Sequence, residues 1–253
     1  MAERISFAVE KYGLLPTNHF GARKQRSAEH ALLLLQEHIY TAALRRQVLS
    51  LVHHGCETAV KRDALGGAYD GVCKDTLVQR LAARGIPVGL VNWIDDFCSE
   101  RAATIVFNGR SSEVCELEQP GLPQSSPLSP ILFLFFNADL VQQKIDQNGG
   151  AIAFVDDYTA WVVGKTAAEN LDRLKTVVQL ATRWESRSGA SFEGEKTSFT
   201  HSTRNSQQSP DEPITVKGQD VRPTPSVKIL GLIMDSELRY KEHTARSDER
   251  VEA

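Results

Sequence analysis

The sequence predicts an α+β fold in which antiparallel strands alternate with amphipathic helices. Two apolar runs of strand length, residues 151–155 and 158–163, flank a two-residue acidic turn. An Asn-Gly pair at 108–109 lies between two β-rich runs, which is the usual pattern of a hairpin. Residues 166–187 carry apolar side chains at helical spacing. Strands joined by tight turns, together with long helices, are typical of an antiparallel sheet that packs on helices.

The N-terminal half contains three predicted helices and one hairpin. A helix is expected over residues 27–48, where apolar side chains recur on one face. A second helix is expected over residues 74–84, because a glycine and then a proline follow it. Residues 90–97 suit a third amphipathic helix, and residues 104–117 the hairpin.

The C-terminal half begins with the two apolar strands and continues into a long helix. Thr166 and Glu169 have the spacing of a capping box, so we expect the helix to begin there. The remaining predicted segments are a polar loop at 202–213, strands at 214–217 and 227–234, and a charged, disordered tail from residue 243.

Asp156 and Asp157 are the most informative residues of the chain. They place two carboxylates at the tip of an otherwise apolar hairpin. Such a turn suits hard divalent cations, which prefer oxygen ligands. The alternative is that the two aspartates only make the turn, since aspartate is a common turn residue.

A second motif lies about thirty residues upstream of the acidic pair. Residues 119–130 form a loop rich in Gly, Pro and Ser, and a strongly apolar helix follows at 131–140. Pro127 or Pro130 is a natural residue for the first turn of that helix. Backbone amides of such a loop and a helix N-terminus can meet phosphate or a template strand.

The loop, the helix and the acidic pair resemble motifs B and C of reverse transcriptases, most closely the non-LTR (LINE-like) retrotransposon branch. Further motifs of that family are matched in the same order, and the resemblance covers roughly residues 3–243. These matches are residues 15–28 to the first fingers motif, 67–72 to the second half of motif A, 191–197 to motif D and 227–235 to motif E.

The resemblance implies a polymerase palm, which is a ferredoxin-like antiparallel sheet backed by helices, with partial fingers and no complete thumb. The domains expected from it are a basic fingers segment at 1–62, a palm at 63–242 with an inserted fingers element at about 71–115, and a tail at 243–253.

The activity implied by the resemblance is RNA-directed DNA polymerisation by a two-metal mechanism with Mg²⁺ or Mn²⁺. The implied partners are an RNA template, a DNA primer and deoxynucleoside triphosphates, and a longer polyprotein would supply the thumb or endonuclease regions. A catalytically inactive retrotransposon remnant with weak nucleic-acid binding is the alternative. An unrelated RNA-binding domain of the same fold class would need exposed aromatic side chains on the sheet.

Each residue implied by the resemblance has a simpler structural alternative. Tyr69 can be a core aromatic residue, Gln124 a loop cap and Lys196 a surface charge. The implied metal ligands are Asp156, Asp157 and Asp63, with Lys196 as a further catalytic residue. The implied nucleotide-binding residues are Tyr69, Gln124, Ser125, Arg23 and Lys24, of which the last two equally suit a solvated helix start.

Two departures from the family pattern put activity in doubt. The family places an aspartate five residues before the motif A aromatic, where this chain has Ala64, and Asp63 is one place too early. A shift of one residue in a strand turns the side chain to the opposite face. Residues 53–66 also lack the expected apolar strand and resemble inserted sequence, and Ser125 occupies a position that is glycine in the family.

Composition indicates an intracellular globular protein of the cytoplasm and nucleus. Residues 1–62 carry a net charge of +4, which leaves −7 for the rest of a chain whose net charge is −3. No apolar run is long enough for a transmembrane helix, and the N-terminus lacks a signal-peptide pattern. The four cysteines are isolated and expected to be reduced, and the pair His53-His54 lacks a third metal ligand at a suitable spacing.

Overall fold

The computed structural model describes residues 1–56, 69–117, 121–203 and 211–245. Its helices are α1 (Ala2–Tyr12), α2 (Ala28–Leu44), α3 (Lys74–Ala83), α4 (Val88–Phe97), α5 (Ser129–Val141) and α6 (Ala167–Ser188). Its strands are β1 (Val48–Cys56), β2 (Ala102–Ala103), β3 (Val106–Phe107), β4 (Arg110–Ser111), β5 (Cys115–Glu116), β6 (Gly150–Phe154), β7 (Asp157–Gly164), β8 (Phe192–Ser202), β9 (Ile214–Val216), β10 (Gln219–Val221), β11 (Ser226–Ile229) and β12 (Leu232–Asp235). The fold is mixed α+β, as the sequence predicts. Within these ranges, none of the helices has the length and apolar character that crossing a bilayer requires.

Four strands form one antiparallel sheet in the order β6, β7, β1, β8. β1 is an inner strand, and it pairs with β7 from Val48 opposite Gly164 to Gly55 opposite Asp157. On its other side it pairs with β8, where the register shifts near Cys56. The sheet therefore includes β1, whose residues fall within 1–62, the range expected to form the fingers segment.

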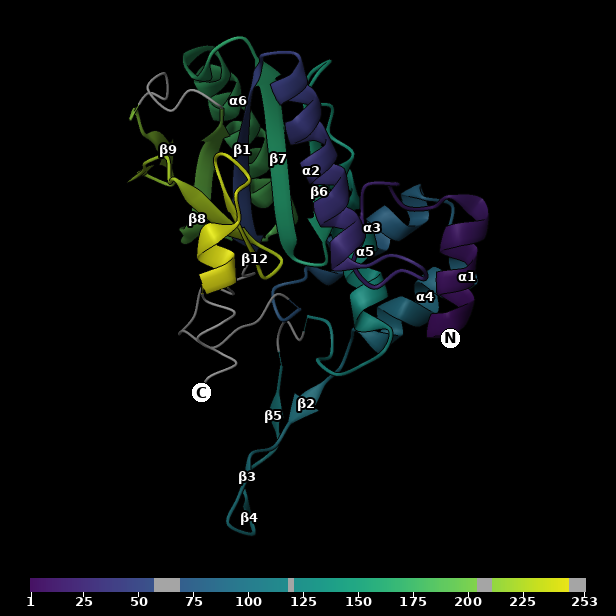
Figure 1. Ribbon diagram of the computed structural model, residues 1–253. Coiled ribbons are helices and arrows are strands. Elements are labelled where there is room, and N and C mark those ends of the chain that lie inside the picture. The colour runs from purple at the N-terminus through teal and green to yellow at the C-terminus, as the bar shows by residue number, and fades with distance from the viewer. Residues whose placement is uncertain (57–68, 118–120, 204–210, 246–253) are drawn as a thin grey trace.

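Helices cover both faces of this sheet. Leu49 and Leu51 of β1 are buried in a cluster with residues of α2, whereas Val52 is buried in a second cluster with residues of α5 and α6. In Figure 1, α2 lies in front of the sheet and α6 behind it. α5 is buried almost all round because its side chains are apolar on every face, and Pro130 lies in its first turn as expected.

α6 begins and ends close to the predicted residues. The Thr166 hydroxyl accepts a hydrogen bond from the Glu169 amide at 3.1 Å. The Glu169 carboxylate accepts from the Lys165 amide rather than from that of Thr166, so the expected capping box is only half formed. Gly189 ends the helix at a φ of 72°, which glycine adopts without steric cost.

A narrow two-stranded arm projects from the body of the molecule (Figure 1). It consists of β2 paired with β5 and, further out, β3 paired with β4. Asn108 and Gly109 reverse the chain at φ values of 48° and 75°. These are the positive angles that a two-residue hairpin turn requires, so the predicted hairpin is confirmed.

Residues 53–56 continue the strand that begins at Val48, so the expectation that this part of 53–66 lacks a strand is wrong. His53 and His54 are accommodated in the buried strand because each has a polar partner on a neighbouring strand. His53 Nδ1 lies 2.9 Å from the Thr159 hydroxyl, and His54 Nδ1 lies 3.0 Å from the Thr197 hydroxyl. Strand pairing and hydrogen bonds thus replace the apolar contacts that the prediction required. The remainder of the segment lies outside the described residues.

Candidate active site

The acidic turn between β6 and β7 has an unusual backbone conformation. Val155, which precedes the two aspartates, has a φ of 55°. A β-branched residue rarely adopts a left-handed conformation, because its side chain then crowds the backbone. The turn must therefore be held by its surroundings, and such strain is typical of functional sites.

A buried hydrogen-bond chain holds the Val155 peptide. The Asn137 side chain, on α5, donates to the Val155 carbonyl at 2.7 Å. The other side of the same amide lies 2.8 Å from Nε2 of His19. Burial lowers the pKa of His19 to about 4, so the ring is neutral at pH 7 and donates through Nε2 to the Asn137 oxygen.

The segment before α2 closes the turn from a second side. The Phe20 amide donates to the Ala153 carbonyl at 2.8 Å, and the Ala153 amide donates to the Asn18 carbonyl at 3.1 Å. Gly21 follows directly, and a β-carbon there would lie 2.5 Å from both the amide nitrogen and a methyl group of Val155. Only glycine allows this approach of the chain to the turn.

Asp157 on β7 is close to a histidine of the adjacent strand β1 and within electrostatic range of a lysine of β8, the next strand along the sheet. Its Oδ1 is 3.8 Å from Nε2 of His53 on β1. Burial raises the pKa of Asp157, and the Lys196 charge on β8 opposes that increase. Burial also lowers the pKa of His53 to about 4, so this imidazole is neutral at pH 7.

Tyr69 connects the turn to the loop that precedes α5. Burial raises the pKa of its phenol and the negative charge of Asp156 adds to the increase, so the phenol is within electrostatic range of that carboxylate. The Tyr69 ring meets Phe133 of α5 edge to face at 5.6 Å, and the Tyr69 carbonyl accepts from the Leu122 amide at 2.8 Å. A β-carbon on Gly121 would lie 2.4 Å from that carbonyl.

The loop residues expected to meet a nucleotide are exposed beside this junction. Gln124 donates to the Asp70 carboxylate at 3.0 Å. Ser125 is exposed and has a φ of 65°, a left-handed conformation that favours glycine. The left-handed backbone at position 125 thus explains why the reverse transcriptase pattern has glycine there.

The two basic residues of the N-terminal segment have different environments. The Arg23 guanidinium is buried, and it forms a two-point ion pair with Glu10 of α1 at 2.7 and 2.8 Å. It also donates to the carbonyls of Pro16 and His19. Lys24 is exposed to solvent. The donors of Arg23 are therefore used within the fold, whereas Lys24 is accessible to a ligand.

The described residues do not bring a complete metal cluster together. Among them, no group of three or more His, Cys, Asp or Glu side chains converges in a metal-binding arrangement. Asp63, the third expected ligand, lies outside the described residues. Asp156 and Asp157 supply oxygen donors suited to a divalent ion, and β1 meets them with His53 instead of a carboxylate.

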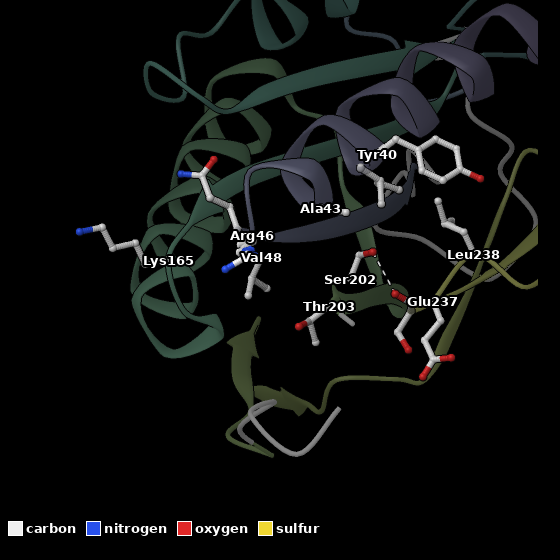
Figure 2. Close-up of a pocket in the computed structure, with 12 residues that line it drawn as sticks. Tyr40, Ala43, Arg46, Val48, Lys165, Ser202, Thr203, Glu237 and Leu238 are labelled. Atoms are coloured by element: carbon white, nitrogen blue, oxygen red, sulfur yellow. Dashed lines mark hydrogen bonds between the residues drawn. The ribbon is translucent and has the colours of Figure 1, made fainter. Parts of the chain in front are cut away.

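A separate cavity of about 340 Å³ lies at the other end of β1. Figure 2 shows its lining, in which Arg46 and Val48 lie near Ser202 and Thr203. Ser202 donates to the Ser236 carbonyl at 2.9 Å. Val48 is opposite Gly164 whereas Gly55 is opposite Asp157, so this cavity is separated from the acidic turn by the length of the strand.

The family model for "Reverse transcriptase (RNA-dependent DNA polymerase)" matches residues 2–234. The chain belongs to the reverse transcriptase family. Divalent metal ions are typical of that family.

One curated relative and several solved structures are similar to this chain. The RNA-directed DNA polymerase from mobile element jockey of Drosophila funebris is 24% identical over 209 residues, which are 78% of this chain and 22% of that protein. Telomerase of Candida tropicalis, truncated from its C-terminal domain, has a TM-score of 0.59 and 13% identity over 93% of this chain and 42% of that one. Telomerase of Candida albicans in complex with a fragment of telomeric RNA has a TM-score of 0.56 and 11% identity over 92% of this chain and 38% of that one. This reverse transcriptase chain therefore shares a fold with telomerases and spans about a fifth of the curated relative.

Three residues of the site were missed or set aside in the sequence analysis. His19 and Asn137 lie 118 positions apart, and no local pattern connects them. His53 was set aside for want of a third ligand nearby in the sequence, yet its neighbour Asp157 comes from the adjacent strand. The antiparallel pairing of β1 with β7 was the signal that could have joined them.

Proposed function

We propose that this chain is the polymerase core of an RNA-directed DNA polymerase from the non-LTR retrotransposon branch. Its palm would consist of the four-stranded sheet with α5 and α6, and α1, α3 and α4 would contribute to the fingers. One observation carries the proposal: the strained Asp156-Asp157 turn lies beside the end of β1, and Tyr69 links it to the 121–125 loop. The 22% share of the relative's length makes its substrates and partners part of this proposal.

The roles proposed for individual residues follow their positions around the turn. Asp156 and Asp157 hold divalent ions, and Lys196, whose charge acts on Asp157, would meet a leaving pyrophosphate. Tyr69 packs against the sugar of the incoming nucleotide, and Gln124 and Ser125 touch the nucleotide or the template. Bound Mg²⁺ or Mn²⁺ would supply activation of the primer hydroxyl and neutralisation of the leaving group.

Template and primer are the proposed nucleic-acid partners. Lys24 is exposed in the N-terminal segment and is the residue proposed to meet a template phosphate. Arg23 has a different proposed role, because its ion pair with Glu10 fixes α1 against the segment that supports the turn.

The face that β1 presents to the turn favours a second candidate function, an inactive remnant with weak nucleic-acid binding. The residues of that face nearest the turn are His53 and Gly55, and neither supplies a carboxylate. Loss of a metal contact in the transition state costs several kcal/mol, or on the order of a thousandfold in rate. We therefore expect the chain to bind a primer and template while extending the primer poorly.

A primer-extension assay on an RNA template, together with a binding assay for the same duplex, tests both candidates. Binding without appreciable extension in Mg²⁺ or Mn²⁺ is the expected result. Extension that is lost in Asp156→Ala would establish an active polymerase and overturn the inactive reading. Absence of both binding and extension, in a chain shown to be folded by circular dichroism, would overturn the proposed function.

A further inference from the structure

A groove between α1 and α4 carries large apolar side chains that are open to solvent. Its volume is about 790 Å³, which is within the usual range of binding pockets. In its lining, the exposed fraction is 50% for Met1, 66% for Tyr12 and 41% for Trp93. Figure 1 shows both helices at the end of the molecule opposite β8 and β9. Large apolar side chains that gather at the surface in this way indicate a place where a partner binds.

The two walls of the groove have the spacing of helix faces. The α1 wall is a stripe of residues three or four positions apart, namely Met1, Ile5, Ala8 and Tyr12. Leu90 and Trp93 form the α4 wall, three positions apart. Rows of side chains at these spacings fit between the rows of a neighbouring helix. α1 has 11 residues and is therefore about 16 Å long, which is the length of three turns of a partner helix.

Small residues leave room between the two walls. A β-carbon added to Gly85 or Gly89 would meet nothing within 4 Å. Ala8 is the small residue of the α1 wall. Packed helices have axes about 8–10 Å apart, depending on the side chains at the contact, so small residues here allow a third helix to approach closely.

The occupant of this groove has to satisfy its own backbone hydrogen bonds. The walls are helical and offer no strand edge with which an extended peptide could pair. An extended peptide would therefore leave amide and carbonyl groups unpaired against apolar side chains, which is unfavourable. A helix uses these groups internally and presents only its side chains.

The charge of the groove specifies the partner further. Both charged side chains in the described lining are arginines, Arg4 and Arg84. Arg84 is fixed, because it donates to the Leu14 carbonyl at 2.8 Å and to the Gln142 side chain at 2.7 Å. Arg4 is exposed, and none of the ion pairs between described residues includes it. A carboxylate of the partner would thus gain a charge-assisted hydrogen bond from Arg4 without displacing another group. A single-stranded nucleic acid would instead need cations all along its path.

We propose that the groove binds an amphipathic helix of a separate protein, with apolar side chains three and four residues apart and Asp or Glu beside them. The apolar stripe covers Tyr12 and Trp93, and the acidic residue pairs with Arg4. This inference goes beyond the proposed function, because the groove shares no lining residue with the acidic turn or the 121–125 loop. Its failure would leave the proposed polymerase core as it stands.

A synthetic helix tests the groove on the full chain. The probe is a peptide of about 14 residues, nearly four turns, with Leu at every third or fourth position and Glu between them. Calorimetry measures its affinity, and acrylamide quenching of Trp93 reports where it binds, because Trp161 and Trp184 are only 2% and 1% exposed. We expect a dissociation constant on the order of 10 μM, typical of a small interface, and protection of Trp93.

Two further peptides separate the apolar stripe from the charge. One has the same composition in an order without a stripe, and the other has Lys in place of Glu. Each should bind on the order of tenfold more weakly than the probe. The net charge of −3 would favour the Lys peptide, so a preference for Glu assigns the effect to the arginines of the groove.

Variants of the chain locate the binding. Gly89→Leu fills the groove and should weaken the probe on the order of tenfold or more, whereas Ala168→Leu adds the same side chain at an exposed position of α6 and should not. Arg4→Glu should reverse the preference between the Glu and Lys peptides. Arg183→Glu, the same change at an exposed position of α6, should leave the preference unchanged.

Several results would overturn the proposal. These are equal affinity for the probe and the peptide without a stripe, absence of binding, and unchanged affinity in Gly89→Leu. If Gly89→Leu fails to fold, the exposed Arg4 decides, and an unchanged peptide preference in Arg4→Glu overturns the proposal. A dimer in sedimentation that Gly89→Leu dissociates would assign the groove to a second copy of the chain. Displacement of the probe by single-stranded oligouridylate would assign it to RNA, and either assignment would also overturn the proposal.

Discussion

Val155 illustrates how single residues determine the geometry of the site. Its left-handed conformation, with φ at 55°, is unfavourable for a β-branched side chain. The Asn137 amide and the close approach of Gly21 hold it from two sides. The cost of the turn is thus offset by contacts from segments far away in the sequence, and the direction of both aspartates depends on those contacts.

The approach of Gly21 to the turn gives the first prediction. A β-carbon there would lie 2.5 Å from the Val155 amide nitrogen, and backbone does not move aside easily. We expect Gly21→Ala to lower the free energy of unfolding by about 2 kcal/mol or more. Urea denaturation measures this change, and metal binding at the turn should weaken in parallel.

Gly89 of α4 is the matched control for that substitution. Its added β-carbon would meet nothing within 4 Å, and its φ is not positive. Gly89→Ala should therefore raise the free energy of unfolding by about 0.5–1 kcal/mol. Similar effects of the two substitutions would show that contact with Val155 is not what requires glycine at position 21.

Ser125 gives a second prediction at the residue scale. Its φ of 65° costs about 1–2 kcal/mol of stability for a residue with a β-carbon, and glycine removes this cost. Glycine also makes the unfolded chain more flexible, which lowers the stability of the folded state by about 0.4–1 kcal/mol. We expect Ser125→Gly to stabilise the protein by about 0.5 kcal/mol or more. Ser125→Ala retains the β-carbon and should give no gain. A gain in Ala equal to that in Gly would mean that the hydroxyl, and not the backbone, is unfavourable.

Individual elements differ in how far the sequence predicts them. α2, α3, α4 and α6 correspond to predicted helices, because their apolar side chains recur at helical spacing over more than two turns. α1 was not predicted, since only Ile5 and Val9 of its residues are buried. β8 was not predicted as a strand, because its polar residues are stabilised by pairing with β1, which no local pattern reveals.

The candidate site was predictable only where its residues are adjacent in the sequence. Asp156 and Asp157 form a recognisable turn, and the loop before α5 is recognisable from its Gly, Pro and Ser content. Contacts such as that of His53 with Asp157 depend on the register of two strands. A register is set by burial along whole strands and cannot be read from one motif.

The pair β1 and β8 contains three buried histidines that should make stability depend on pH. Burial lowers the pKa of His53 to about 4, that of His54 to about 3 and that of His201 to about 4. The unfolded chain binds these protons near pH 6.5, so stability is fully present above pH 6.5 and falls as the pH decreases towards 4. Urea denaturation at pH 7.5 and 5.5 should show the loss.

Two variants test whether this loss of stability at low pH comes from the buried histidines of the sheet. His201→Gln removes one such group and should reduce the slope between pH 6.5 and 5 by at most about 1.4 kcal/mol per pH unit. His30→Gln removes an exposed histidine and should leave the slope unchanged. Stability that is constant from pH 7.5 to 5.5 would contradict the burial of neutral histidines in this sheet.

At the scale of the whole molecule, β1 joins segments that are distant along the chain. It pairs with β7 on one side and β8 on the other, and its two faces contact α2 and α6. The acidic turn, Lys196 and the histidines therefore meet only because this strand lies between them. A chemical change at the end of β1 should alter the site without disturbing the remaining fold.

Gly55 is the position where such a change tests the proposed polymerase. It lies opposite Asp157 on the same face as His53, and its added β-carbon would lie 3.3 Å from the β-carbon of Lys196, so the two strands must separate by a few tenths of an ångström. Gly55→Asp places a third carboxylate beside the turn, so we expect Mg²⁺ affinity to rise on the order of tenfold. Combined with Ser125→Gly and joined to a thumb segment, this chain should extend a primer on an RNA template. Gly55→Asn, which has the same shape without the charge, should neither raise Mg²⁺ affinity nor give primer extension.

If the thumb-fused chain extends the primer equally well when residue 55 is glycine, the metal site is already complete and a carboxylate such as Asp63 supplies the third ligand. If the aspartate improves metal affinity and extension stays absent, the limiting defect lies in how primer and template are held and not at the end of β1.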